Sequence, residues 1–294
     1  MANARVLVRR RKVVRNTRKI TKTMEKISTA RLAKAQAAAL AARPYSSKLK
    51  EIITDVISTG IKLEHPLLES RAQPKNAMII LLTSDRGLCG AFNSNLIRLA
   101  RTLIANLKTQ GRTLQFIVQG KKGIGAFKYL KLPITERLIG ISDKPTYARA
   151  EIIADKLIAG YSKKEIDEVY IIYSAFKTGS AQQPKQEMLL PLLALQSNDS
   201  KAKTESRKDM TDYLFHPDPK TILAQALPLV VKMTLFTAML ENTASEHATR
   251  RVAMKNATDN ADEMIKDLTR VYNRARQGKI TREIAEIVGG ANAL

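Results

Sequence analysis

The chain has 294 residues, a formal net charge of +23 and 44% hydrophobic residues. That apolar fraction can form one or two ordinary folded domains, so a wholly disordered chain is excluded. The single cysteine, Cys89, excludes an intrachain disulfide and a multi-cysteine metal cluster. There is no run of 18 apolar residues, so we expect no segment to span a bilayer.

Residues 3–58 predict one long helix, because they contain no glycine and are rich in Ala, Lys, Arg and Leu. Four apolar residues recur every seven positions and should form a seam against a partner helix: Val6, Val13, Ile20 and Ile27. Because this register begins at Val6, we expect the basic N-terminus to be mature structure rather than a targeting peptide. Pro44 should bend or interrupt the helix. Eight alanines between Ala30 and Ala42 either thin the helix for close packing or simply reflect high helix propensity.

The segment from about residue 77 to residue 195 predicts alternating strands and helices. The expected strands are Met78–Leu82, Leu114–Val118, Ile134–Ile139, Val169–Tyr173 and Glu187–Leu195. The expected helices are Phe92–Lys108, Lys121–Leu130 and Tyr147–Ala159. Such alternation indicates a mostly parallel sheet that is covered by helices. The polar stretch Ser197–Lys208 should be a flexible excursion.

A second long helix is predicted over residues 221–288. The Pro217-Asp218-Pro219 sequence is a favourable helix start, whereas Pro228 should mark a kink or the true start. Five residues at four-three spacing should form a coiled-coil seam: Ala261, Ile265, Leu268, Tyr272 and Ala275. Gly289-Gly290 should end the helix. The two terminal helices can bury their stripes against each other, which predicts a paired shaft attached to a compact domain.

Two loops resemble sites of chemistry. Thr83–Gly90 lies between a strand and a helix, where α/β folds bind phosphate or place nucleophiles. It lacks both nucleotide-loop patterns, and Cys89 has no histidine nearby in the sequence, so a structural turn is favoured over a catalytic role. The glycine-rich segment Gly120–Gly125 also fails both templates and indicates a helix-entry turn.

The remaining polar residues predict no catalytic or metal centre. His65, His216 and His247 are far apart and lack neighbours at metal-ligand spacing, so surface or capping roles are favoured. Neither a paired-carboxylate site nor a nucleophile-base pair is discernible, and we expect no cofactor. Residues 1–50 carry a net charge of +14, with Glu25 as the single acid. We interpret this basic segment as facing an acidic partner, although a solvated helix face is the alternative.

Six motifs, in family order along nearly the whole chain, resemble the gamma subunit of F-type ATP synthases. They are Asn16–Met24, Thr83–Gly90, Glu241–Ala248, Arg251–Ala261, Asn273–Gln277 and Ile280–Gly290. The resemblance implies an α/β fold with a long antiparallel coiled coil of the N- and C-terminal helices and a central Rossmann-like domain. It implies a shaft helix over residues 1–60, the central domain over 75–197, and the second shaft helix over 217–294.

The family implies a rotor subunit that is not catalytic alone. It would couple transmembrane ion flow, through rotation, to ATP synthesis or hydrolysis at the catalytic beta subunits. Implied partners are the alpha and beta subunits of the catalytic ring, the epsilon subunit and the membrane c-ring, but not nucleic acid. The implied location is peripheral, on the cytoplasmic face of the bacterial plasma membrane. The two-cysteine insert of chloroplast relatives is absent.

The resemblance also implies roles for single residues. Met24 resembles a shaft residue near a beta-subunit lever loop. Four residues resemble positions that touch the beta catch loops and the upper sleeve: Arg250, Arg276, Gln277 and Thr281. Tyr213 resembles a foot residue near the membrane ring. Gly278-Lys279 departs from the pattern and should weaken the helix there by about 1 kcal/mol.

Two functions of other classes remain open on the residues alone. A basic coiled-coil protein that binds nucleic acid would explain the charge of residues 1–50, although it does not explain the C-terminal motifs. An enzyme that uses Cys89 is a more distant alternative.

Overall fold

The computed structural model describes residues 4–58, 65–176, 182–192 and 219–291. The chain forms two compact units: residues 1–30 with residues 250–294, and residues 31–249. Two long helices, α1 (Ala4–Ser58) and α6 (Pro219–Ala291), contribute to both units. We describe each unit by itself.

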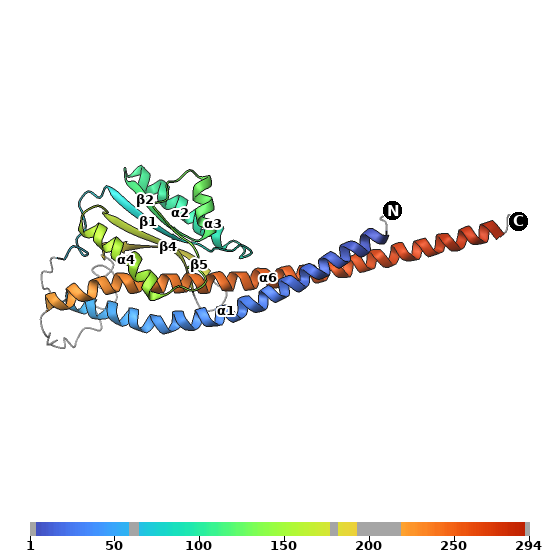
Figure 1. Ribbon diagram of the computed structural model, residues 1–294, viewed down its shortest axis with the longest axis horizontal. Helices are drawn as coiled ribbons and strands as arrows, with labels where there is room; N and C mark the ends of the chain where they lie inside the picture. Colours follow the sequence, from blue (N-terminus) through green and yellow to red (C-terminus); the bar gives the residue numbers. More distant parts are fainter. Residues whose placement is uncertain (1–3, 59–64, 177–181, 193–218, 292–294) are drawn as a thin grey trace, which may run out of the picture. The chain divides into compact units, whose positions relative to one another are not determined.

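In the first unit, α1 and α6 lie side by side and run antiparallel (Figure 1). Three contacts join them: the Arg11 guanidinium lies over the Tyr272 ring, Arg18 forms an ion pair with Asp262, and the Thr21 and Thr258 hydroxyls share a hydrogen bond. Residue numbers rise along one helix as they fall along the other, which is the arrangement of an antiparallel coiled coil. The expected pairing of the terminal helices is therefore confirmed.

The buried seam of α1 is displaced by one residue from the predicted one. Val6, Val13, Ile20 and Ile27 are 45–60% exposed, and the prediction that they face the partner helix is wrong. The next row along the helix is the least exposed one: Leu7, Val14, Thr21, Ser28 and Ala35. A seven-residue spacing gives the period of a coiled coil but not its phase. From Thr21 onward the inward row consists of small side chains, which allow close helix approach.

The seam predicted for α6 is confirmed. Ala261 is buried, and Ile265, Leu268, Tyr272 and Ala275 are half-buried among exposed neighbours. The seam therefore follows the four-three spacing of the sequence.

Prolines interrupt the two long helices less than expected. Pro44 lies inside α1, and Pro228 lies inside α6, which begins at Pro219 as the sequence indicated. Leu227 and Val230, on either side of Pro228, are almost fully buried. Their burial offsets the roughly 3 kcal/mol that an interior proline costs. The described part of α6 ends at Ala291, directly after Gly289-Gly290, where the sequence predicted its end.

The second unit is built on a five-stranded sheet. Its strands are β1 (Asn76–Leu82), β2 (Thr113–Gln119), β3 (Glu136–Leu138), β4 (Glu168–Phe176) and β5 (Gln182–Leu190). The order is β3-β2-β1-β4-β5, with β5 antiparallel to β4 and the other pairs parallel. This confirms the mostly parallel sheet. The strand expected to reach Leu195 ends at Leu190, because Pro191 cannot donate to the ladder; residues 193–195 lie outside the described part.

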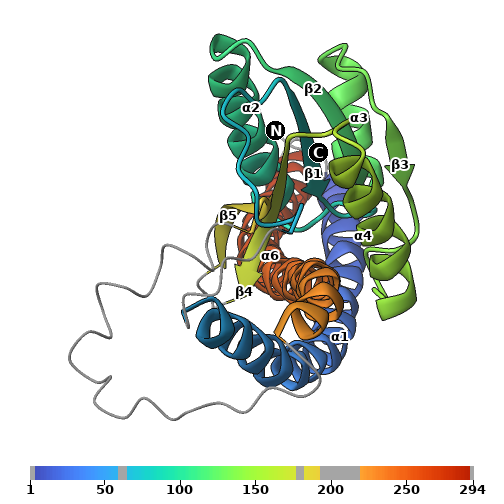
Figure 2. The same ribbon diagram turned by 90° about the vertical axis from the view of Figure 1, so that its left-hand side faces the viewer.

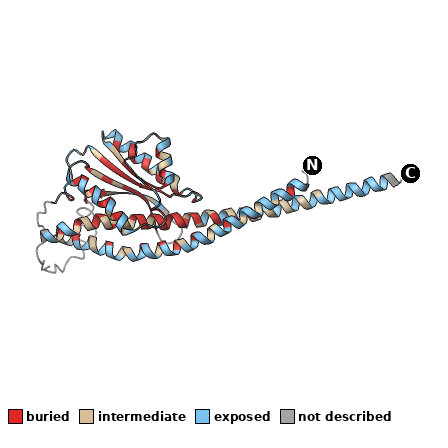
Figure 3. Ribbon diagram, viewed as in Figure 1, coloured by how far each residue is buried: buried red, intermediate tan, exposed pale blue. Residues whose placement is uncertain are grey.

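Helices cover both faces of the sheet. α2 (Phe92–Thr109) and α3 (Lys121–Tyr129) pack on one face, and α4 (Tyr147–Ser162) lies on the other (Figure 2). Along β1, Met78, Ile80 and Leu82 enter the core with α4, and the alternate residues enter the core with α2. A strand that is buried on both faces explains the continuous apolar run in the sequence. Figure 3 shows this burial along the strands.

Part of α6 belongs to the core of the second unit. Leu223, Leu227, Val231 and Leu235 are buried in the cluster that includes α4. Between Thr221 and Gly289, α6 contains an 18-residue window whose length and mean hydropathy of 1.6 would suit a membrane span. The sequence prediction of no such segment did not anticipate this window. In this structure 44% of that window is buried.

Candidate functional site

The loop after β1 is held by the glycine-rich segment that follows β2. The Thr83 hydroxyl donates to the Gln119 carbonyl oxygen at 2.5 Å and accepts from the Gly123 amide at 2.9 Å. A Cβ at Gly120 or Gly123 would collide with Thr83. The glycines therefore allow close approach of Thr83, and Gly120 immediately precedes α3. This confirms the interpretation of Gly120–Gly125 as a helix-entry turn.

Asp85 joins the loops that follow three parallel strands. Its carboxylate accepts hydrogen bonds from the Lys121 amide at 3.1 Å, the Gly140 amide at 3.0 Å and the Ser142 hydroxyl at 3.0 Å. These partners come from the segments after β2 and β3. Because its acceptors are used within the fold, Asp85 acts as a structural link.

Cys89 is buried in the same loop and is 2% exposed. Its thiol lies 3.2 Å from the Asn93 amide nitrogen and 3.8 Å from the Ser84 hydroxyl oxygen. The Asn93 side-chain oxygen also accepts a hydrogen bond from the Ser84 backbone amide, at 3.0 Å. These contacts confirm that Thr83–Gly90 forms a strand-to-helix turn between β1 and α2, and its lack of a catalytic role stays a prediction. Leu88, within it, has a φ of 61° and is 60% exposed.

A segment of α6 is hydrogen-bonded to the carboxyl end of β4 and to the loop that follows β3. β4 lies beside β1, and the following strands are added on opposite sides of this pair, which is the place where open α/β sheets usually bind ligands. Asn242 accepts from the Ser174 amide at 3.0 Å, and the Ser245 hydroxyl donates to the Ser174 carbonyl oxygen at 3.0 Å. Thr243 donates to the Ser142 carbonyl oxygen at 2.8 Å. These bonds tie α6 to the end of the sheet at which open α/β folds usually bind ligands.

Sequence reasoning did not find this role of α6. Residues 242–248 are all buried, although five of the seven are polar or charged. His247 is 2% exposed, so the prediction of a surface or capping role for it is wrong. The sequence feature that could have indicated this role is the run of polar side chains inside a long helix, because such side chains can form hydrogen bonds with the ends of strands.

The other histidines differ. His65 accepts a hydrogen bond from the Leu67 amide at 3.2 Å and so holds the turn at residues 66–68; no helix begins in this described segment. Burial lowers the pKa of His65, against an opposing effect of Glu69. His216 lies outside the described residues. Within the described ranges, no three His, Cys, Asp or Glu residues gather as a metal site would need.

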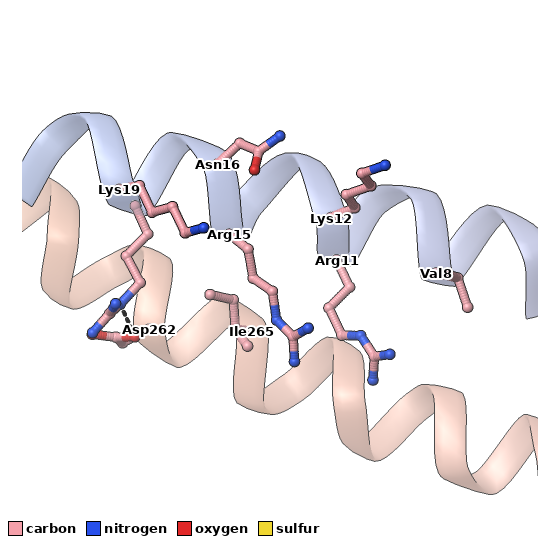
Figure 4. A pocket seen from close by; sticks show the side chains of 9 residues that line it. Val8, Arg11, Lys12, Arg15, Asn16, Lys19, Asp262 and Ile265 are labelled. Atoms are coloured by element: carbon pink, nitrogen blue, oxygen red, sulfur yellow. Dashed lines mark ion pairs between the residues drawn. The ribbon is translucent and has the colours of Figure 1, made fainter.

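The first unit carries a basic groove of about 510 Å³ between α1 and α6 (Figure 4). It is lined by Val8, Arg11, Lys12, Arg15, Asn16, Arg18, Lys19, Asp262 and Ile265. Figure 4 shows Arg11 and Arg15 reaching toward α6. Asp262 is the one acid of this lining, and it pairs with Arg18. The groove can therefore accept an anionic group.

The residues singled out by resemblance occupy different environments. Met24 is half-buried on α1, and its carbonyl oxygen accepts from the Ser28 hydroxyl at 2.8 Å. Three residues are exposed on α6: Arg276, Gln277 and Thr281. Arg250 is 5% exposed, which leaves little of its surface available. Tyr213 and the segment Ser197–Lys208 lie outside the described residues.

Comparison with known proteins gives matches over the whole chain. A family model described as ATP synthase matches residues 3–294. The ATP synthase gamma chain of Gemmatimonas aurantiaca is 41% identical over 294 residues, which cover 100% of this chain and 99% of the relative. That of Leptospira biflexa is 41% identical, with 100% of both chains covered.

Solved structures share the fold. A chain of the Tetrahymena thermophila mitochondrial ATP synthase central stalk and c-ring has a TM-score of 0.59 and 24% identity, and the match covers 81% of this chain and 99% of that chain. A chain of the Euglena gracilis mitochondrial ATP synthase OSCP/F1/c-ring has a TM-score of 0.63 and 18% identity, with 99% and 94% covered. Taken with the full-length curated relatives, these findings establish that the chain belongs to the ATP synthase gamma chain family.

Proposed function

We propose that this chain is the central-stalk rotor subunit of an F-type ATP synthase and is not catalytic alone. The observation that carries the proposal is the 41% identity to ATP synthase gamma chains along the entire length. The antiparallel pairing of α1 and α6 supports it, because a paired helix can act as a stiff shaft. The hydrogen bonds of α6 to Ser174 and Ser142 support it as well, because they tie the helix to the sheet domain.

The mechanism follows from differential contact. An off-axis shaft presents different faces to three equivalent beta subunits, and each face favours one beta conformation over the others. Proton or sodium flow turns the rotor, so each catalytic site passes through binding, synthesis and release of ATP. In reverse, ATP hydrolysis drives rotation and ion transport.

The proposed partners are the alpha and beta subunits, the epsilon subunit and the membrane c-ring. The complex would be peripheral, on the cytoplasmic face of a bacterial plasma membrane. We assign residues 1–60 and 217–294 to the shaft, and residues 75–197 to a central domain that meets epsilon and the c-ring. The basic lining of the groove favours an acidic partner surface.

We assign partner contacts to the residues that match the family. Met24 would lie near a beta lever loop, and Arg276, Gln277 and Thr281 would touch catch loops and sleeve. The exposure of Arg276, Gln277 and Thr281 suits such contacts. Arg250 is assigned to the same set by resemblance, although it is mostly buried. Tyr213 is assigned to the foot near the membrane ring.

Reconstitution tests the proposal. Purified chain should show no ATPase activity by itself, and should co-purify with alpha and beta subunits to form a complex that hydrolyses ATP and rotates. Failure to assemble with them would refute the proposal. Steep, salt-dependent binding of duplex DNA at about 50 mM salt would instead favour a nucleic-acid function for the basic helix.

A charge at Met24 tests the residue assignment. Met24→Lys should place a positive charge beside the beta lever and reduce the number of ions pumped per ATP hydrolysed. The measurement is ATP-driven ion pumping in vesicles, normalised to hydrolysis. Lys26→Met is a matched control on the exposed side of α1. Unchanged pumping per ATP in the Met24 variant would remove Met24 from the proposed contact set.

A further inference from the structure

Arg43 joins α1, β4 and α6 at one point in the second unit. Its Nη2 donates to the Phe176 carbonyl oxygen at 2.6 Å and to Glu241 Oε1 at 2.9 Å. Its Nε reaches the same carboxylate oxygen at 3.2 Å. The other oxygen of Glu241 accepts from the Phe176 amide at 3.4 Å. We call Arg43, Glu241 and Phe176 the clamp.

The clamp lies beside a closely packed contact between α1, β4 and α6 that is made mostly of small side chains. Leu32, Ala35, Phe176, Ala244 and Ala248 form one buried cluster beside it. Alanine side chains let the helices approach closely, but they form low ridges that resist rotation and sliding weakly. Directional hydrogen bonds from a charged group therefore fix the rotation of α1 against α6 and the sheet.

A second arginine of α1 makes an independent anchor. Arg31 Nη1 donates to Asp143 Oδ2 at 2.9 Å. Asp143 follows Ser142, whose carbonyl oxygen accepts from Thr243 of α6. Arg31 and Arg43 are twelve positions apart in the sequence, which corresponds to about 18 Å along the helix. Two separated anchors resist both rotation of the helix about its axis and sliding along it.

We propose that the clamp, with Arg31–Asp143 as its second anchor, carries torque between the helix pair and the sheet. This rests on the proposed rotor function and names the residues through which the sheet domain turns with the helices. Arg43, Glu241 and Arg31 are positioning residues, because they act by holding α1, α6 and β4 together. Loss of these residues should make the rotor less stiff to twisting, so that the sheet domain can rotate by a larger angle relative to the helix pair.

Arginine is required at position 43 by geometry. Its planar fork bonds a carboxylate and a carbonyl oxygen at the same time, whereas a lysine ammonium offers one small charge centre. Arg43→Lys should therefore preserve charge but lose part of the clamp. Glu241→Gln keeps the side-chain shape and removes the ion pair. A charge swap, Arg43→Glu with Glu241→Arg, restores the pair with its direction reversed.

The experiment measures torsional stiffness in the assembled complex of this chain with alpha and beta subunits. A bead is attached through Tyr129→Cys, a position that is 87% exposed, while the buried Cys89 thiol stays unlabelled. Angular fluctuations of the bead are recorded with the ring immobilised and rotation paused. Lys156→Ala is the control, because it breaks the exposed Lys156–Glu136 ion pair within the sheet domain and leaves α1 untouched.

The expected result is a wider angular distribution for Arg43→Ala and Glu241→Gln, and no change for Lys156→Ala. Because the packed core of α6 also resists rotation, losing one anchor should raise the angular variance by no more than about twofold. The charge swap should narrow the distribution relative to Arg43→Glu alone. Unchanged variance in Glu241→Gln and Arg43→Lys complexes that assemble and rotate would overturn the proposal, even if Arg43→Ala fails to assemble. A wild-type complex that does not rotate would refute the rotor function itself.

Discussion

The hydroxyl oxygens of Thr21 and Thr258 lie 2.8 Å apart in the seam between α1 and α6. They are 8% and 5% exposed, so the pair is a polar layer in a buried contact. One hydroxyl donates to the other, and the accepting hydroxyl donates to a backbone carbonyl oxygen of its own helix, that of Arg18 for Thr21 or that of Met254 for Thr258. A shift of one helix along the other would separate the two hydroxyls and bury them against unmatched side chains. The pair therefore favours a single register of the two helices.

Replacing Thr258 by valine should cost about 1 kcal/mol, because a buried hydrogen bond is lost and the shape is kept. The double variant Thr21→Val/Thr258→Val should cost less than the sum of the single variants, since no unmatched hydroxyl remains. Guanidinium unfolding of the full chain, followed by circular dichroism, measures both. Thr23→Val, an exposed position on α1, is the control. Strict additivity of the two single effects would show that the hydroxyls do not interact.

Truncating exposed and buried apolar residues tests the phase of α1. Ile20 is 60% exposed, whereas Leu32 is 8% exposed and belongs to a buried cluster. Ile20→Ala should change the free energy of unfolding of the isolated chain by less than about 0.5 kcal/mol. Leu32→Ala should lower it by about 2–4 kcal/mol, through lost burial and a new cavity. A large loss in the Ile20 variant would restore the seam first predicted from the sequence.

The contrast between α1 and β1 shows which parts of the fold the sequence determines. Met78–Leu82 is apolar at every position, so neither face of the strand offers polar side chains to solvent. The sequence therefore predicted a strand that is buried on both faces. Along α1, two neighbouring rows share the same seven-residue period, and the larger side chains suggested the wrong one. Which of the two rows is buried depends on how closely α1 can approach α6. That distance is a property of the two helices together, and the sequence of α1 alone does not give it.

The candidate site was predictable in position but not in its bonding. The placement of Thr83–Gly90 after a strand was enough to indicate a strand-to-helix turn. The partners of Asp85, however, come from loops that follow other strands. Arg43 and Glu241 are 198 residues apart, so no local spacing relates them. Contacts of this kind arise only when the strand order brings distant segments together.

The Asp167 carboxylate should make stability depend on pH. Burial alone would raise the pKa of Asp167, but hydrogen bonds from the Asn76 amide, the Arg71 side chain and the Lys75 amide outweigh it and lower that pKa below its ordinary value. A carboxyl whose folded-state pKa is depressed contributes stability that is complete above its unfolded-state pKa of about 4. The contribution is lost as the pH falls below that value toward the folded-state pKa.

The free energy of unfolding measured between about pH 7 and pH 2 tests this dependence. Asp167→Asn should be less stable than wild type near neutral pH, and the difference should shrink as the wild-type carboxyl becomes protonated. Asp267→Asn, whose side chain is 69% exposed, controls for the loss of one negative charge. A difference between wild type and Asp167→Asn that stays constant over the whole range would contradict the ionised, hydrogen-bonded role.

Two glycines of α3 should respond to alanine in opposite directions. A Cβ at Gly123 would lie 2.6 Å from Thr83 Oγ1 and 3.0 Å from Val118 Cγ1, whereas a Cβ at Gly125 would meet no described atom within 4 Å outside its chain neighbours and the backbone of its own helix. Thr83 cannot move aside easily, because its hydroxyl is bonded to the Gln119 carbonyl oxygen. Gly123→Ala should therefore destabilise the chain by about 1–3 kcal/mol.

Gly125→Ala should stabilise the chain by about 0.5–1 kcal/mol, because alanine loses less backbone entropy than glycine in a helix. Thermal unfolding of both variants beside wild type compares them directly. Comparing the two variants separates two effects. Helix propensity favours alanine at both positions, whereas the close approach of Thr83 disfavours alanine at Gly123 alone. Stabilisation by both substitutions would mean that the loop after β1 yields to an added methyl group, and that the contact with Thr83 does not fix the strand-to-helix turn.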